Sequence, residues 1–225
     1  MTQMNADQNE SVRQALRRSL MVPVFYHESY EISEAVMSIC FEEGIEMFEY
    51  TNRGAKAAEN FERLQSKCLQ NYPGRYIGIG TIKTVAEANQ FVKLHPAFVV
   101  SPLVNTEVGS ICAENNIPWM PGCLTPTEIQ QASTHGASVV KIFPASAIAP
   151  SYIKAIKAVF PEVFIMPTGG IKADRAVLKE WFDAGVLCVG MGSELLDKEL
   201  VQNKKWDELR EKIKNARELV ISCTL

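Results

Sequence analysis

The chain has 225 residues, of which 47% are apolar and 22% are charged, and its formal net charge is −3. This is the composition of an ordinary globular protein, and the mild acidity with scattered Lys and Arg argues against a nucleic-acid partner and against a basic membrane-surface patch. No apolar run approaches the roughly 18 residues of a membrane span, and the polar start of the chain lacks the pattern of a signal peptide.

Residues 1–10 are polar and are expected to be flexible, and residues 11–20 predict an N-terminal helix. Short apolar runs then alternate with segments that carry helix signals, such as Thr84 and the pair Thr125-Pro126. The chain is expected to close with a helix over residues 203–220. The eight apolar runs span residues 21–27, 47–52, 76–82, 98–102, 118–124, 139–144, 164–170 and 186–193.

Alternation of strands and helices predicts an α/β fold with a parallel sheet. Eight such units within about 200 residues fit a (β/α)8 TIM barrel with an extra N-terminal helix. A doubly wound open sheet is the alternative. The barrel is favoured because there are eight runs, because no linker divides the chain, and because polar residues and glycines gather after many runs. We therefore expect a single domain over residues 1–225, with its active site at the carboxyl ends of the strands.

The second run carries an unusual row of polar side chains. Met47, Glu49, Thr51 and Arg53 share one face of the expected strand, and three of the four are polar or charged. Solvent exposure explains one such residue more easily than a row. The row is consistent with a structural ion pair, or with a proton-transferring carboxylate at Glu49 and an anion-binding guanidinium at Arg53.

The third and fourth runs end in residues that are expected at the rim. The motif G-I-G-T at 78–81 lacks the third glycine and the acidic residue of a dinucleotide fingerprint, so Gly78 and Gly80 are interpreted as close-packing positions. Thr81 lies near the end of this run, and Pro102 ends the next one. Both are expected to border the substrate pocket.

The stretch A-S-V-V-K-I-F-P-A at 137–145, which contains the sixth run, places a lysine inside a pattern typical of a buried strand. A buried ammonium is unfavourable, so such a lysine reaches solvent, pairs with an anion or gives up its proton. Val140 and Ile142 suit contact with outer helices, which directs Lys141 and Phe143 at the barrel interior. An exposed edge lysine is the simpler alternative, whereas a neutral interior amine would be a nucleophile.

Glycine-rich motifs follow the last two runs, T-G-G-I at 168–171 and G-M-G-S at 190–193. Many barrels bind phosphate at these two positions, because glycines let backbone N–H groups approach the oxygens. Ser193 is expected to start a helix whose N-terminus favours an anion. Glycine turns also connect strands to helices without binding anything. Together the two motifs predict a phosphate site at this side of the barrel.

Six cysteines and three widely separated histidines show no C-x-x-C motif and no clustered ligand set. Neither a disulfide framework nor a metal site is therefore predicted, and no cofactor is implied. A reducing cytoplasm is the expected location.

In this order, the motifs resemble those of the 2-keto-3-deoxy-6-phosphogluconate (KDPG) aldolase family, class I aldolases that include 4-hydroxy-2-oxoglutarate (KHG) aldolases. The resemblance extends from Val22 to about Leu196. The matching pieces are P-V at 23–24, F-E-Y-T-N-R at 48–53, G-I-G-T at 78–81, V-S-P at 100–102, P-G-C-L-T-P-T-E at 121–128, K-I-F-P-A at 141–145, P-T-G-G-I at 167–171 and G-M-G-S at 190–193.

The resemblance implies that Lys141 forms a Schiff base, that Glu49 moves protons and that Arg53 holds the substrate carboxylate. It implies a metal-independent and typically trimeric lyase that cleaves KDPG to pyruvate and glyceraldehyde 3-phosphate. Cleavage of 4-hydroxy-2-oxoglutarate to pyruvate and glyoxylate is a further expected activity. The other residues that the resemblance places around a phosphorylated 2-keto acid are Thr81, Pro102, Phe143, Thr168, Gly169, Gly170, Gly192 and Ser193.

Two departures from the family pattern lie near the sugar-binding half of the site. Leu103 stands where many members have glycine, and Tyr26 and His27 end the first run. A different 2-keto-3-deoxy sugar acid therefore stays open as the substrate. The alternatives of other classes are a phosphate-binding barrel isomerase or epimerase without a covalent lysine, and a non-enzymatic phosphosugar-binding barrel.

Overall fold

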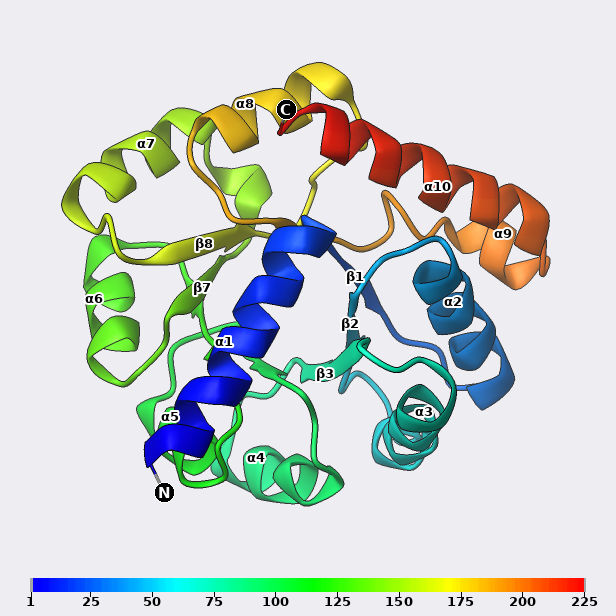
Figure 1. Ribbon diagram of the computed structural model, residues 1–225, viewed down its shortest axis with the longest axis horizontal. Coiled ribbons are helices and arrows are strands. Elements are labelled where there is room, and N and C mark those ends of the chain that lie inside the picture. Colours follow the sequence, from blue (N-terminus) through cyan, green and yellow to red (C-terminus); the bar gives the residue numbers. More distant parts are fainter. Residues whose placement is uncertain (1, 225) are drawn as a thin grey trace.

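A computed structural model describes residues 2–224 as strands surrounded by helices (Figure 1). Thr84 and Thr125 each open a helix with a capping box, in which Glu87 and Glu128 supply the reciprocal bonds, so both predicted helix starts are confirmed. The helices are α1 (Thr2–Ser19), α2 (Tyr30–Glu42), α3 (Ala57–Asn71), α4 (Val85–Phe91), η1 (Val92–Leu94), α5 (Thr106–Glu114), α6 (Pro126–Thr134), η2 (Ala145–Ala147), α7 (Pro150–Val159), α8 (Arg175–Asp183), α9 (Lys198–Gln202) and α10 (Trp206–Ser222).

All pairings between the described strands are parallel, which confirms the predicted α/β fold with parallel strands. One sheet has the order β5-β4-β3-β2-β1-β9 and the other has the order β6-β7-β8. The strands are β1 (Met21–Phe25), β2 (Met47–Thr51), β3 (Tyr76–Gly80), β4 (Val99–Val100), β5 (Trp119–Met120), β6 (Gly122–Cys123), β7 (Val139–Ile142), β8 (Phe164–Pro167) and β9 (Val189–Met191).

The fifth predicted run forms two strands, β5 and β6, because Pro121 interrupts it. Proline has no N–H to donate to a ladder. Its carbonyl still accepts a hydrogen bond of 2.9 Å from the Lys141 N–H, so β7 remains attached at this point. On the other side, a parallel bridge joins Thr168 to Gly190 between the two sheets.

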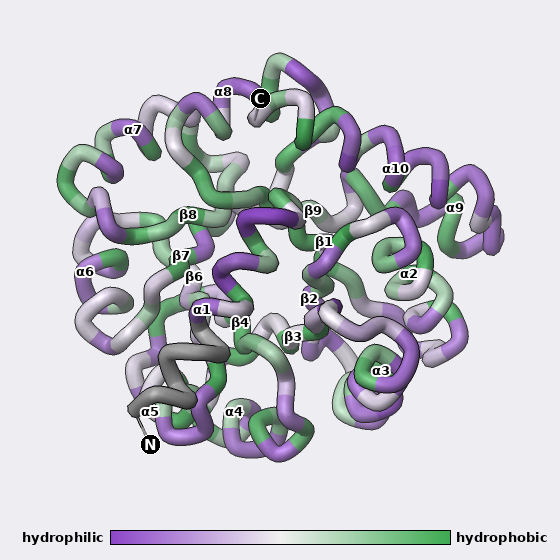
Figure 2. Tube along the Cα trace, in the orientation of Figure 1, coloured by the Kyte–Doolittle hydropathy of each residue, from purple (hydrophilic) through white to green (hydrophobic). Residues whose placement is uncertain are grey.

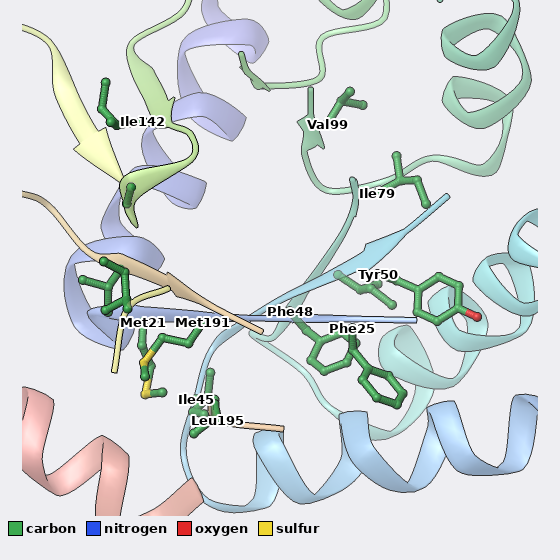
Figure 3. Close-up of a cluster of buried hydrophobic side chains, with 14 of the residues drawn as sticks. Met21, Phe25, Ile45, Phe48, Tyr50, Ile79, Val99, Ile142, Met191 and Leu195 are labelled. Carbon is green, nitrogen blue, oxygen red and sulfur yellow. The ribbon is translucent and has the colours of Figure 1, made fainter. Parts of the chain in front are cut away.

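The side chains of each strand alternate between two buried clusters, as the sequence pattern predicts. Val139 belongs to the inner cluster with Met47 and Met166, whereas Val140 and Ile142 belong to the outer cluster that packs against the helices. Figure 2 shows mainly hydrophobic strands inside helices of mixed hydropathy. In Figure 3, Phe25, Phe48 and Tyr50 gather beside β1 and β2 in the outer cluster. The alternation leaves the opposite face of β2 and β7 for Glu49 and Lys141.

Helix α1 covers the amino-terminal ends of the strands, where Leu16 joins the inner cluster and Arg18 pairs with Glu46 at 2.7 Å. The helix predicted over 11–20 lies within α1 except for Leu20, whose left-handed φ of 57° ends the helix. Because α1 begins at Thr2, it includes most of residues 1–10, whose flexibility stays a prediction.

Helix α10 begins at Trp206 rather than at the predicted residue 203. Lys204 adopts a left-handed φ of 52°, which separates α9 from α10. The predicted end at residue 220 falls two residues before the observed end at Ser222. Across residues 2–224, no helix combines the length and the apolarity that crossing a membrane requires.

Candidate active site

A lysine and a carboxylate meet in the interior of the protein, although 92 residues separate them in the chain. The Lys141 Nζ lies 3.3 Å from Oε1 and 3.4 Å from Oε2 of Glu49 and donates to the carboxylate. Lys141 is 5% exposed and Glu49 is 1% exposed. Because both groups are shielded from water, each charge is stabilised chiefly by the other.

Glu49 owes its place to the residues paired with it on the neighbouring strands. It is in register with Val24 of β1 and with Gly78 of β3. Two residues further along β3, a Cβ at Gly80 would lie 2.7 Å from Cδ and 2.8 Å from Cγ of Glu49. A glycine at position 80 therefore provides the space that the Glu49 side chain occupies. Gly78 differs, because a Cβ there would meet the Phe98 ring instead.

A second glycine lies on the strand next to Lys141. The Lys141 backbone is in register with Gly122 of β6 and with Met166 of β8. A Cβ at Gly122 would collide with the carbonyl group of Pro102, so the loop after β4 packs directly over the strand next to the lysine. The predicted rim position of Pro102 agrees with this contact. The sequence suggests that Pro121-Gly122 shapes the rim, but it does not predict this contact with Pro102, since a Pro-Gly pair is also common in connections that have no function.

Phe143 follows Lys141 on the same face of the chain, beyond the end of β7. Its ring centroid lies 5.5 Å from the lysine Nζ, a cation–π distance. The ring is half-buried. It can therefore provide an apolar wall beside the amine while leaving access from the carboxyl-terminal side.

Arg53 and Thr81 stand at the carboxyl ends of β2 and β3. Arg53 is exposed, and its N–H donates to the Thr51 carbonyl at 3.0 Å. Among the residues that the structure describes, no carboxylate is within ion-pair distance of its guanidinium, which can therefore accept an anionic ligand. Thr81 has a left-handed φ of 65°, which is strained for a β-branched residue and is typical of functional positions.

Thr168 and the two glycines after it end β8 at the same rim. Thr168 is 5% exposed, and its buried Oγ1 has no hydrogen-bond partner, so the hydroxyl can serve a bound ligand. Gly169 and Gly170 have φ values of 96° and 79°, which only glycine adopts readily. These three residues thus form a polar turn with a backbone that tolerates close approach.

Ser193 does not start a helix, and that expectation is wrong. Gly192 is half-buried and Ser193 is exposed in a turn, where the Gly192 carbonyl accepts bonds from the Leu195 and Leu196 N–H groups. Burial of both leucines fixes this turn, and the following helix α9 begins only at Lys198. An anion bound there would meet turn amides and the serine hydroxyl rather than a helix terminus.

Cysteine chemistry is disfavoured near this site. Cys123 lies on β6, in register with Ile142, and is buried. Burial raises the pKa of its thiol to about 12, so it carries no thiolate at neutral pH. Within residues 2–224, no three His, Cys, Asp or Glu side chains are grouped to hold a metal ion. Among the described groups, the buried lysine and carboxylate are therefore the strongest candidates for chemistry.

Comparison with known proteins agrees with this arrangement. A family model described as KDPG and KHG aldolase matches residues 12–212. The chain belongs to this family. The predicted family, and with it the aldolase class of lyases, is therefore confirmed, and neither the isomerase nor the non-enzymatic alternative gains support.

Relatives within the KDPG and KHG aldolase family carry two substrate names. The chain is 33% identical over 162 residues to a 2-dehydro-3-deoxy-phosphogluconate aldolase of Treponema pallidum, covering 72% of this chain and 75% of that protein. It is 36% identical over 120 residues to a 2-dehydro-3-deoxy-6-phosphogalactonate aldolase of Escherichia coli, covering 53% of this chain and 58% of that protein.

A solved structure of the family supports the same fold and chemistry. A KDPG aldolase from Legionella pneumophila, with pyruvate captured as a covalent carbinolamine intermediate, is 28% identical with a TM-score of 0.80. The match covers 90% of this chain and 96% of that one. A carbinolamine requires an amine nucleophile, which makes class I chemistry the mechanism of this relative.

Proposed function

We propose that this protein cleaves KDPG to pyruvate and glyceraldehyde 3-phosphate through a Schiff base on Lys141. The observation that carries the proposal is the contact of the Lys141 Nζ with the Glu49 carboxylate, at 3.3 Å and in a site that is almost closed to water. A nucleophile beside its own proton acceptor is the arrangement that covalent carbonyl chemistry requires.

The first half of the reaction forms the Schiff base. Transfer of one proton from the ammonium to Glu49 leaves a neutral amine, whose lone pair attacks the C2 ketone carbon. The resulting carbinolamine loses its hydroxyl group as water once a proton is returned to that oxygen. The product is a protonated imine, which withdraws electrons from the neighbouring carbons.

The second half breaks the C3–C4 bond. Glu49, directly or through a water molecule, removes the proton of the C4 hydroxyl group, and the electrons of the C3–C4 bond move toward the imine nitrogen. This step releases glyceraldehyde 3-phosphate and leaves an enamine. Protonation at C3 and addition of water to the imine then release pyruvate and restore the free amine.

The remaining predicted residues bind the two ends of the substrate. Arg53 is proposed to hold the carboxylate, since its guanidinium has two parallel N–H donors for the two oxygens. Thr81, Thr168, Pro102 and Phe143 would line the pocket. The phosphate would lie at the other side of the barrel, at Gly169, Gly170, Gly192 and Ser193.

A second substrate is favoured by a specific observation. One relative is a phosphogalactonate aldolase, and gluconate and galactonate differ in configuration at C4. C4 carries the hydroxyl group from which Glu49 would take a proton, so the two acids need different placements of that group. A panel of both phosphorylated acids, with 4-hydroxy-2-oxoglutarate as the short acid without phosphate, separates the candidates by their kcat/KM values.

We also propose that the strands form one closed (β/α)8 barrel in a single domain. The bridge between Thr168 and Gly190 and the bond from the Lys141 N–H to the Pro121 carbonyl support closure on the two sides. The homotrimer is likewise a proposal, which light scattering on the purified protein tests directly. The cytoplasmic location stays a prediction.

Borohydride trapping tests the central proposal. Incubation with pyruvate and borohydride should reduce the imine and attach the three-carbon unit to Lys141, as peptide mass spectrometry would show. Lys141→Ala should abolish the adduct, while Lys154→Ala, at an exposed lysine of α7, should leave it unchanged. An adduct on a different residue, or none on the wild-type protein, would contradict the assignment.

A further inference from the structure

Tyr26 lies directly after β1 and contacts the turn that follows β2. Its buried hydroxyl group makes no well-aligned hydrogen bond within residues 2–224, but it lies beside the backbone of Lys56 in the same turn. A Cβ at Gly54 would collide with this hydroxyl and would lie only 2.6 Å from the Cζ of the ring. Gly54 immediately follows Arg53. The phenol therefore packs against the backbone of the residue next to the proposed carboxylate-binding arginine.

The Tyr26 ring packs in turn against a second tyrosine. Its centroid lies 5.6 Å from that of Tyr50, which is fully buried on the outer side of β2 (Figure 3). The Tyr50 hydroxyl donates to the His27 carbonyl at 2.8 Å and accepts a bond of 3.2 Å from Asn60 on α3. These bonds connect the end of β1 with β2 and α3. Tyr26 therefore packs against a side chain that is itself fixed by hydrogen bonds to the segment after β1 and to α3.

The turn next to Tyr26 makes few hydrogen bonds to other elements beyond Asn52. Lys56 is the N-cap of α3, and its side chain makes no capping hydrogen bond. The Arg53 N–H bonds only to the nearby Thr51 carbonyl, and the Gly54 carbonyl accepts a bond of 3.0 Å from Ala57. Before Arg53, the Thr51 hydroxyl donates to the Phe25 carbonyl at 3.4 Å and the Asn52 N–H donates to the Gly80 carbonyl at 2.8 Å, so the start of the turn is attached to β1 and β3. At Gly54, beyond these bonds, the contact with Tyr26 is what links the turn to the end of β1.

We propose that Tyr26 is a positioning residue. It holds the Arg53–Gly54 turn in the position from which Arg53 binds the substrate carboxylate. The inference rests on the proposed function, because that function assigns the carboxylate to Arg53. Tyr26 acts through packing, since its ring lies against Gly54 while its hydroxyl makes no well-aligned hydrogen bond. Burial raises the pKa of this hydroxyl, which therefore stays neutral and does not itself offer a charge to the substrate.

The experiment compares steady-state cleavage of KDPG by Tyr26→Ala, Tyr26→Phe and Arg53→Ala, alone and combined. Tyr26→Ala should raise KM at least about tenfold with kcat changed less than about threefold, because the turn carries binding and not the reacting groups. Tyr26→Phe should stay within about twofold of wild type in both constants. In the Arg53→Ala background, Tyr26→Ala should change KM less than about twofold, since the two act as a unit.

Two further variants distinguish a loss of positioning from a general loss of stability. Gly54→Ala keeps the aromatic ring but forces the turn away from it, and should raise KM as Tyr26→Ala does. Tyr72→Ala removes a half-buried ring of equal size near the end of α3, where it packs 5.3 Å from Phe41, and should lower stability without changing KM. Circular dichroism confirms that each variant is folded before its kinetics are measured.

The possible outcomes separate the two proposals. A wild-type KM in both Tyr26→Ala and Gly54→Ala would overturn the positioning role while leaving the aldolase intact. An undiminished effect of Tyr26→Ala in the Arg53→Ala background would also overturn it. Loss of substrate binding in Tyr26→Phe would show that the hydroxyl itself is needed and would contradict a packing role. Failure of the wild-type protein to trap pyruvate would overturn both proposals.

Discussion

Gly80→Ala tests whether the position of Glu49 controls turnover. The new Cβ would lie 2.7 Å from Cδ and 2.8 Å from Cγ of Glu49, and closer still to Oε1. Carbon atoms that do not share a bond rest about 3.5–4.0 Å apart, so the carboxylate has to move by roughly 1 Å. It cannot move freely, because Glu49 is 1% exposed and is surrounded by backbone on both sides.

A displacement of about 1 Å in a catalytic group costs roughly a hundredfold in rate. We therefore expect kcat for Gly80→Ala to fall about a hundredfold, as measured by coupling pyruvate release to lactate dehydrogenase. The Lys141 amine is still present, so pyruvate should still be trapped by borohydride, though more slowly. A fall in turnover with retained trapping would assign the damage to proton transfer rather than to the nucleophile.

Gly78→Ala is the matched control, two residues earlier on the same strand. Its Cβ would meet the ring of Phe98 in the inner cluster and not the Glu49 carboxylate. It should lower stability and leave kcat of the folded protein within about threefold of wild type. In a Glu49→Gln background, Gly80→Ala should add less than about threefold. A kcat near wild type for Gly80→Ala alone would refute the reasoning.

Three other expected outcomes concern the same site. Glu49→Gln should retain some pyruvate trapping but lose about 10²–10⁴-fold in turnover, and unchanged turnover would remove Glu49 from the mechanism. Lys141→Met leaves the buried Glu49 charge without its partner and should lower the free energy of unfolding by about 3–5 kcal/mol in urea titrations. Adding Glu49→Gln to this variant should restore most of the lost stability. If stability is not restored, the two side chains are not an energetic pair. Thr81→Gly should relieve its left-handed backbone and raise stability by about 1 kcal/mol while weakening substrate binding, whereas lower stability would mean that the backbone is not strained.

Much of the fold could be predicted because it depends on local patterns. Alternation of side chains along β7 placed Val140 and Ile142 against the helices and Lys141 inside, and the inner and outer clusters confirm this division. The helix starts at Thr84 and Thr125 followed from capping chemistry that involves only neighbouring residues. Where the prediction for Ser193 was wrong, the cause was burial of Leu195 and Leu196, which depends on packing against distant parts of the chain.

Sequence patterns alone predicted that strands alternate with helices, that Glu49 and Lys141 each share a face with inward residues, and that the motifs resemble those of a lysine-dependent aldolase family. Long-range packing is needed to show that these two side chains meet at 3.3 Å, that Gly80 leaves space for Glu49, that Gly122 leaves space for the Pro102 carbonyl, and that Tyr26 packs against Gly54. Alternation and capping are short-range, because they follow from the geometry of adjacent residues. Contacts between residues far apart in the chain depend on strand register and on close packing, which no single segment specifies.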